Sequence, residues 1–260
     1  MNDELVNYLI SYLLNEMPQY KKYASKYSSS MSDRKKLLRS LMNLRPPMEA
    51  SEQFLKLQNY YLQNELENMG LVDCNSLTVS DYSKIALWKG DIMRLKVDAI
   101  VNPGNEDMLG CFVPNHNCID NEIHSYAGVQ LRSACQKETK LKGSKMAIGD
   151  VFVTGAYNLP SSFVFHVLGP SIRGRTTYAE QNLLKRCYVN VLKKATSMNL
   201  KTIVFPCISA GEQGFPKKEA AFIATETVKD FILSEPKSPA VIFDVFTDVD
   251  EKYYTELLFE

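Results

Sequence analysis

The spacing of apolar residues changes character at about residue 72. Before that point, apolar side chains recur every three or four positions, as over residues 5–13, which predicts amphipathic helices. Ser32 stands where a second helix needs an N-cap, and Gly70 stands where a third needs a C-terminal stop. The basic residues of this segment are explained by a solvated helical face better than by a contact patch for an acidic partner. The sequence therefore predicts a helical segment over residues 1–72, and no motif in it indicates a catalytic or metal-binding site.

From residue 84 onward, short and continuous apolar runs alternate with longer amphipathic stretches. This alternation is typical of a buried, mostly parallel sheet with helices on both faces. Ligands of such folds bind at the carboxyl ends of the strands, so the loops that follow strands are the first places to search for a site. The expected strands are 84–88, 97–102, 151–155, 163–169, 201–209 and 241–246, and the expected helices are 119–135, 178–198, 217–232 and 250–259.

Composition and charge exclude several classes of function. The chain has 30 basic and 30 acidic residues, so no overall positive field argues for nucleic acid as a partner. No apolar run is long enough to span a bilayer, and the first residues lack the basic character of a secretory signal. We therefore expect a cytoplasmic protein with reduced cysteines and with neither nucleic acid nor membrane as a partner.

The loop after the expected strand 97–102 contains a compact set of metal-ligating residue types. Cys111, His116 and Cys118 form the pattern C-x4-H-x-C, which places two thiols and one imidazole within reach of a single ion. These ligand types suit zinc, and three protein ligands leave the open position that a catalytic zinc keeps. The alternative is that the cysteines are small buried apolar residues and the histidine is an exposed loop residue.

Neighbouring residues leave other arrangements open. His124 is a competing ligand, or else a helix residue that packs or hydrogen-bonds behind the metal. Asp120 either caps the helix or orients a zinc ligand. His166 lies in an apolar strand and is expected to be a satisfied core histidine, and three cysteines are expected to be structural: Cys74, Cys135 and Cys187. The H-E-x-x-H motif of metalloproteases and the P-C-x-x-C motif of nucleobase deaminases are absent from the sequence.

A second loop, residues 209–216, follows the expected strand 201–209 and precedes a helix. Gly211 and Gly214 allow a tight turn that presents backbone N–H groups, and the helix N-terminus beyond it favours an anion such as a diphosphate. The loop lacks the Gly-Lys-Ser/Thr of a Walker A motif. Phe215 either stacks on a sugar or base or packs in the core.

Three motifs in order resemble the macrodomain family, which binds ADP-ribose. They are Gly90–Asp91–Ile92, Val97 through Asn102 with Asn105, and Ser209 through Pro216. The Gly-rich run that commonly follows the second asparagine is replaced by LGCFVPNHNCIDNEIH, which is similar to the zinc-containing macrodomains of bacteria. The resemblance implies a three-layer α/β/α macrodomain with a mixed, mostly parallel sheet over residues 73–260. Residues 1–72 are similar to the N-terminal helical extension of such proteins.

The resemblance also implies roles for individual residues. Asp91 accepts a hydrogen bond from the adenine amino group, and the Ile92 backbone N–H donates to the ring. Asn105 holds hydroxyls of the distal ribose, whereas Asn102 ties down its own loop. The catalytic set is expected to be Asn105 with the zinc ligands Cys111, His116 and Cys118. The diphosphate loop is expected to contribute Ser209, Ala210, Gly211, Glu212, Gln213, Gly214 and Phe215.

The function that follows from the resemblance is zinc-dependent removal of mono-ADP-ribose from acidic side chains of proteins, with one zinc ion per chain. Members of this group often act on a lipoyl-carrier protein of the glycine cleavage H type, so such a protein is an expected partner. The first alternative is a reader module that binds ADP-ribose without hydrolysis and holds its zinc for structure. The second is a hydrolase of small ADP-ribose derivatives.

Overall fold

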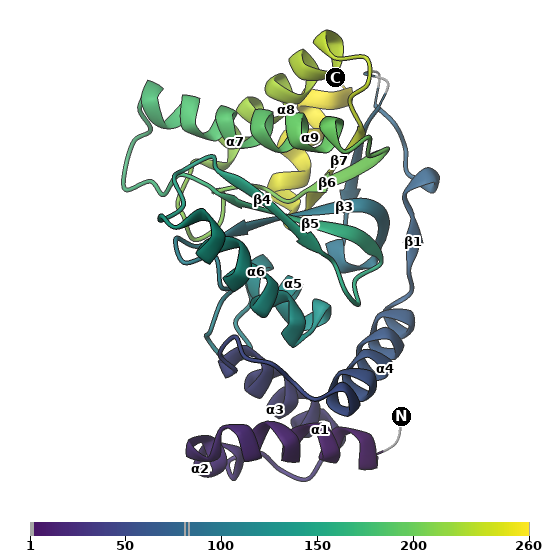
Figure 1. Ribbon diagram of the computed structural model, residues 1–260. Coiled ribbons are helices and arrows are strands. Elements are labelled where there is room, and N and C mark those ends of the chain that lie inside the picture. The colour runs from purple at the N-terminus through teal and green to yellow at the C-terminus, as the bar shows by residue number, and fades with distance from the viewer. Residues whose placement is uncertain (1–2, 81, 83, 260) are drawn as a thin grey trace.

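The computed structural model describes residues 3–80, 82 and 84–259, and it confirms a sheet enclosed between two layers of helices (Figure 1). Six strands lie in the order β2-β7-β6-β3-β5-β4, and β1 pairs with β3 outside this path. All pairs are parallel except β4 with β5, so the sheet is mixed and mostly parallel, as expected. The strands are β1 Val72–Asp73, β2 Ile85–Lys89, β3 Leu95–Gly104, β4 Val151–Gly155, β5 Ser161–Leu168, β6 Thr202–Phe205 and β7 Ala240–Val245.

The central strand β3 is longer than the expected run 97–102. It pairs with β5 from Val97 to Gly104, with β6 at two positions and with β1 at its start. Ala99, Ile100 and Val101 are almost completely buried because helices cover both faces of the sheet at this point. The carboxyl end of β3 therefore projects the loop that follows it from a rigid centre.

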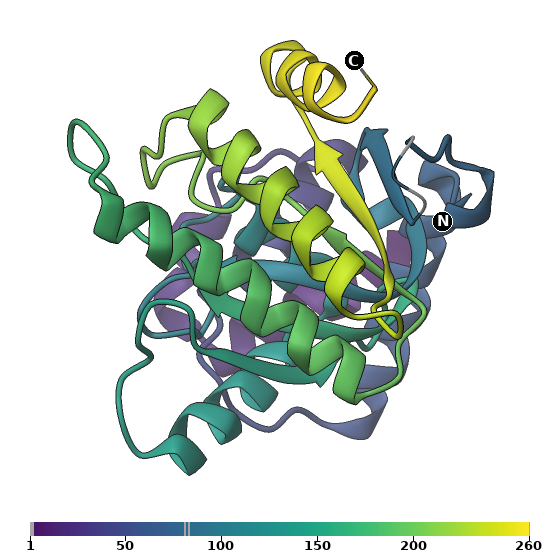
Figure 2. The same ribbon diagram turned by 90° about the horizontal axis from the view of Figure 1, so that it is seen from above.

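Nine α-helices and three short 3-10 helices form within the described residues. Helices α7, α8 and α9 form one apolar core with the sheet, and α5 and α6 form a second core on the other face. Figure 2 shows α7 and α8 lying side by side over the first of these two faces of the sheet. The helices are α1 Asp3–Glu16, α2 Lys21–Ala24, α3 Met31–Leu44, α4 Glu52–Met69, α5 Ile119–Ala127, α6 Val129–Lys142, α7 Tyr178–Ser197, α8 Lys217–Ser234 and α9 Asp248–Phe259, and the 3-10 helices are η1 Pro18–Tyr20, η2 Cys74–Ser76 and η3 Ile92–Arg94.

Two expectations about helices were wrong in detail. The expected single helix 119–135 is two helices, because Gly128 adopts φ +99° between α5 and α6. A Cβ at Gly128 would lie 2.6 Å from the side-chain nitrogen of Gln58, so the close approach of α4 requires glycine there. The N-cap of α3 is Ser30, whose hydroxyl accepts from the Asp33 N–H, rather than Ser32. Gly70 ends α4 as expected, with φ +77°.

The N-terminal helices α1, α3 and α4 pack around an apolar cluster of their own. Val129 of α6 joins this cluster, and Leu66 of α4 joins the core under the sheet. The segment therefore lies against α5 and α6, on the side away from the strands (Figure 1). None of the described helices is both long and apolar enough to cross a membrane.

Candidate active site and metal centre

The two loops singled out in the sequence meet at one edge of the sheet. The connection 105–118 follows β3, and the connection 206–216 follows β6. Because β3 and β6 are parallel neighbours, their carboxyl ends lie side by side, which is where α/β folds bind ligands. The turn that carries Asp91 follows β2, which is parallel to β7 at the same edge.

Cys111, His116 and Cys118 come together in the first connection. The Cys111 Sγ lies 3.5 Å from His116 Nδ1, and one potential ligand atom from each of the three residues lies within 4.8 Å of the others. All three side chains are half-buried. Burial raises the pKa of the Cys118 thiol to about 12, with further contributions from Cys111 and Asp120, so a dication that binds here must displace a proton.

The second ring nitrogen of His116 connects the two loops. His116 Nε2 lies 3.0 Å from a carboxylate oxygen of Glu212 in the 206–216 connection. A carboxylate on the far nitrogen of a ligating imidazole fixes the tautomer and leaves the near nitrogen free for the metal. Two thiols, one imidazole and this carboxylate together fit a zinc ion held through His116 Nδ1.

Left-handed backbone conformations shape the connection around these ligands. Met108 and Asn115 both have φ +53°, and Gly110 has φ +79°. A Cβ at Gly110 would lie 2.7 Å from the ring of His124, so the residue before Cys111 has to be small. The turn at Asn115 places His116 opposite Cys111, and asparagine tolerates this conformation better than most residues do.

His124 lies outside the Cys111 group, in a separate buried cluster with Cys135 and His166. Neither ring nitrogen of His124 has a hydrogen-bond partner among the described residues, and burial lowers its pKa well below 6.5. His166 is the satisfied core histidine that the sequence indicated. Its Nε2 lies 3.0 Å from the Thr154 hydroxyl, and its Nδ1 lies 3.2 Å from the amide nitrogen of Asn102.

The two asparagines make different contacts, and Asn102 does not tie down its own loop as expected. Asn102 is buried, and its amide nitrogen donates to Asp120 at 2.8 Å as well as lying near His166. Within the described residues, Asp120 neither caps α5 nor bonds to Cys111, His116 or Cys118, and its Oδ1 lies 3.6 Å from His124 Nε2. Burial raises the pKa of Asp120 to about 6. The exposed Asn105 ties down its own loop, because its Oδ1 accepts from the N–H groups of Asp107 and Met108.

The turn after β2 carries Asp91, and its neighbours include two residues that the sequence interpretation missed. Asp91 Oδ1 accepts from the Met93 N–H at 2.9 Å, and Ile92 is buried. Asp244 on β7 is buried with one unpaired oxygen within the described structure, and burial, followed by repulsion from Asp91, raises its pKa well above 3.8. Phe246 directly follows β7 and is 72% exposed, so its ring is available to stack on a planar ligand at this edge. Phe246 could have been identified from the sequence as an aromatic residue at the end of an expected strand.

The 206–216 connection forms a tight turn. Ser209 has φ +63°, and its carbonyl accepts from the Phe215 N–H at 3.0 Å. Gly214 has φ +76°, and a Cβ there would lie 2.8 Å from the Ile172 carbonyl. Gly211 and Glu212 are exposed, whereas Phe215 is only 2% exposed and packs in the core. The stacking alternative for the Phe215 side chain is therefore wrong: its ring lies in the core, and its N–H donates to the Ser209 carbonyl.

Comparisons with known proteins agree with this geometry. Residues 101–224, which contain both loops, match the family model described as Macro domain. A Protein-ADP-ribose hydrolase of Treponema medium is 41% identical over 254 residues, covering 96% of this chain and 97% of its own length. A protein of the same name from Staphylococcus aureus is 38% identical, with 95% and 94% covered. The solved structure of the Oceanobacillus iheyensis macrodomain with ADP matches with a TM-score of 0.59 at 33% identity, covering 66% of this chain and 88% of its own.

Proposed function

This chain belongs to the macro domain family, and from that premise we propose that it is a protein-ADP-ribose hydrolase that depends on one zinc ion per chain. The observation that carries the proposal is the convergence of Cys111, His116 and Cys118 beside the loop expected to bind diphosphate. The His116–Glu212 contact joins the two loops, so the ligand set and the anion loop belong to one site.

Each part of ADP-ribose has residues suited to it along this edge. Asp91 keeps one carboxylate oxygen beyond its bond to Met93 N–H, and that oxygen suits the adenine amino group. The exposed tip of the turn, at Gly211 and Glu212, and the start of α8 offer backbone N–H groups to the diphosphate. The distal ribose then falls near Asn105 and the Cys111 group.

The metal part of the proposal rests on the donor set. Cys111, His116 and Cys118 would hold the ion, with Glu212 orienting the imidazole. A zinc ion there would supply a Lewis acid that polarises an oxygen of the reacting bond or lowers the pKa of a bound water toward 7. His124 lies in another cluster, so within the described chain the Cys111 group has three protein ligands, which is typical of catalytic rather than structural zinc.

The finer substrate assignment is an acidic side chain of a modified protein. Hydrolysis adds the hydroxyl of water to the anomeric carbon, while the side chain leaves as a carboxylate and a proton passes to solvent. A carboxylate is a stable leaving group, so no proton donor is needed at the departing oxygen. A lipoyl-carrier protein remains our expectation for the modified partner, and it is tested by offering that protein in its ADP-ribosylated form.

The decisive assay is release of ADP-ribose from a glutamate-modified protein, with and without a chelator. Cys111→Ser should abolish release while leaving most of the affinity for free ADP-ribose, because Asp91 and the 209–215 turn do not touch the thiols. Calorimetry measures the affinity, and circular dichroism confirms that the variant is folded. Cys74→Ser is the matched control, since Cys74 is half-buried in η2, outside the connection that carries Cys111.

Three outcomes separate this proposal from its alternatives. Turnover that persists in a folded, zinc-free Cys111→Ser variant would make the metal structural. Binding of ADP-ribose without any release by the wild-type protein would favour a reader module. Release from small ADP-ribose derivatives but not from modified protein would favour a small-molecule hydrolase.

A further inference from the structure

The N-terminal helices contact the 105–118 connection directly, although they lie outside residues 101–224, the part of the chain that matches the family model. Asn43 near the end of α3 accepts from the Asn115 backbone N–H at 3.0 Å and donates to the Ser125 hydroxyl of α5 at 2.9 Å. The Asn115 side-chain amide in turn donates to the Ser40 hydroxyl at 2.6 Å. Asn115 is the residue with φ +53° directly before His116, so α3 holds the turn that aims this ligand.

Arg39, one turn before Asn43 on the same helix, reaches the next residue of the connection. Its Nη2 atom lies 3.1 Å from the His116 carbonyl oxygen, 2.9 Å from the Asn121 side-chain oxygen and 2.7 Å from Glu122. The amide nitrogen of Asn121 donates to the Val113 carbonyl at 2.9 Å. A single guanidinium therefore joins α3 to α5 and to the backbone of the ligand histidine.

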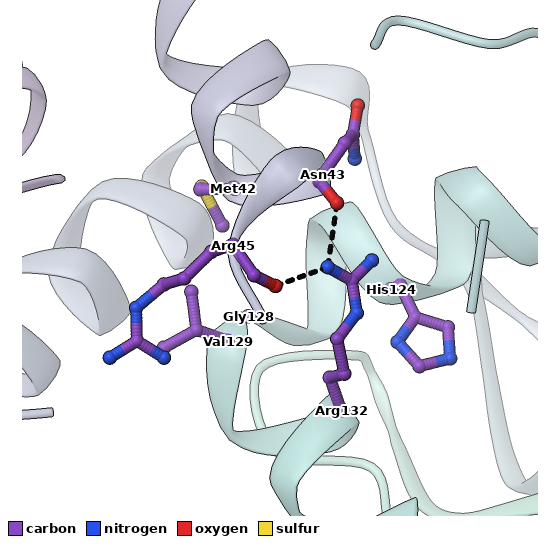
Figure 3. Close-up of a pocket in the computed structure, with 7 residues that line it drawn as sticks. All are labelled: Met42, Asn43, Arg45, His124, Gly128, Val129 and Arg132. Atoms are coloured by element: carbon purple, nitrogen blue, oxygen red, sulfur yellow. Dashed lines mark hydrogen bonds between the residues drawn. The ribbon is translucent and has the colours of Figure 1, made fainter. Parts of the chain in front are cut away.

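Arg132 of α6 closes the arrangement from the other end of the connection. It donates from Nε to the Leu109 carbonyl at 2.7 Å and from Nη2 to the Cys111 carbonyl at 3.2 Å. Its guanidinium carbon also lies 3.9 Å from the centre of the Phe112 ring. Figure 3 shows its remaining nitrogen, Nη1, donating to the carbonyls of Asn43 and Arg45 at the end of α3. Burial lowers the pKa of Arg132 only to about 10, so the side chain stays charged at neutral pH.

These contacts fix the connection at nearly every second residue. Backbone groups of residues 109, 111, 113, 115 and 116 each bond to a side chain from α3, α5 or α6. Partners that orient metal ligands without touching the metal can change its affinity by about 10- to 100-fold. A segment with three left-handed residues has no regular hydrogen-bonding pattern of its own, so its shape depends on these outside partners.

We propose that the N-terminal helical segment is a structural part of the metal centre: Arg39, Ser40 and Asn43, together with Arg132, hold residues 109–116 in the shape that brings the three ligands together. Arg39 and Asn43 are positioning residues, since neither touches the ligand atoms of Cys111, His116 or Cys118. This inference rests on the metal centre of the proposed function, and it assigns a role to residues 1–72 that the sequence alone did not.

The test compares full-length variants by their zinc dissociation constants, measured in competition with a chromophoric chelator. Asn43→Ala removes the acceptor for the Asn115 N–H and should weaken zinc binding by about 10- to 100-fold. Arg39→Met should act in the same direction, and Asn43→Asp, which keeps the acceptor, should restore most of the affinity. Arg34→Met is the matched control, because Arg34 lies on the same helix but bonds to Asp3 and Asn7 of α1.

A second measurement, hydrogen exchange of the backbone amides of residues 109–116 without metal, tests the anchoring independently. Exchange should speed up in Asn43→Ala and Arg39→Met and stay unchanged in Arg34→Met. Wild-type zinc affinity and wild-type exchange in both Asn43→Ala and Arg39→Met would overturn the inference. If the wild-type protein binds no zinc, the metal centre of the proposed function fails, while the exchange experiment still decides whether α3 holds the connection. If Asn43→Ala does not fold, Arg39→Met, whose side chain is partly exposed, decides both measurements.

Discussion

At the scale of single residues, Asp91 caps a short helix and, in the proposed function, also binds the ligand. One oxygen caps η3 through the Met93 N–H, and the proposed contact with adenine uses the other. A substitution that removes both oxygens therefore combines a local structural loss with a loss of recognition. Only a pair of substitutions can separate these two effects.

Asp91→Ala should weaken ADP-ribose binding by about 1.5–3 kcal/mol, the value of one charge-assisted hydrogen bond. Asp91→Asn keeps an acceptor for Met93 but loses the charge, so it should retain the fold and show a smaller loss of affinity. Calorimetry with free ADP-ribose measures both. Affinity in Asp91→Ala equal to that of the wild type would remove Asp91 from the adenine site.

Residue types could be predicted from the sequence better than residue environments. The pattern C-x4-H-x-C identified three side chains that do converge, because short spacing limits how far apart they can lie. The burial of Phe215 and of Asp244 could not be predicted in the same way. Each depends on packing between segments that are distant in the sequence.

At the scale of elements, glycines with positive φ decide where helices stop and how closely loops approach them. Gly128 and Gly70 end helices, whereas Gly110 lets the 105–118 connection lie against the ring of His124. Gly70 was identifiable because an apolar helical pattern ended there. Gly128 was not, since the apolar pattern continues through it and the reason for glycine is the side chain of Gln58 on another helix.

Gly110→Ala should destabilise the protein more than Gly143→Ala. Both glycines have positive φ, and alanine in that conformation costs about 1–2 kcal/mol. A Cβ at Gly143 meets nothing within 4 Å, but at Gly110 it would meet the His124 ring at 2.7 Å and add about 1–3 kcal/mol. The free energy of unfolding in urea measures the difference, and equal losses for the two variants would contradict the tight packing on His124.

At the scale of the whole molecule, two buried neutral histidines make stability depend on pH. Burial lowers the pKa of His166 to about 3 and lowers that of His124 well below 6.5. The unfolded chain binds a proton at each site near pH 6.5, while the folded chain resists protonation down to about pH 3 at His166. Above about pH 6.5, protonation of His166 therefore does not reduce the free energy of unfolding. As the pH falls from about 6.5 toward 3, the unfolded chain takes up this proton and the free energy of unfolding decreases.

His166 alone should account for a loss of about 2 kcal/mol in unfolding free energy between pH 7 and pH 5. His166→Gln should be less stable at pH 7, since it disturbs the bonds to Asn102 and Thr154, but its stability should fall less steeply with acid. Urea unfolding of both proteins with excess chelator gives the comparison. Parallel curves for the two proteins would show that His166 has the same pKa in the folded and the unfolded chain.

The overall architecture could be predicted because strand and helix periodicities are local properties of the chain. The alternating pattern after residue 84 indicated the enclosed sheet, and the family resemblance indicated that it is mixed. The sheet order and the bonds from α3 to residues 109–116 could not be predicted by periodicity. Asn43 and Asn115 are 72 positions apart, and nothing in either local pattern indicates the other.

The order of the strands also has a consequence for synthesis on the ribosome. The ligand-bearing connection is complete at Cys118, but its supporting strand β3 lies between β5 and β6, and β7 follows only at residues 240–245. At roughly 5–20 residues per second, the two thiols leave the ribosome about 6–25 s before the last strand. Helices α1 to α4 precede the connection in the chain, so they are the partners available to it throughout that interval. We therefore expect the contacts from Arg39 and Asn43 to be available to the nascent cysteines before β5, β6 and β7 have been synthesised.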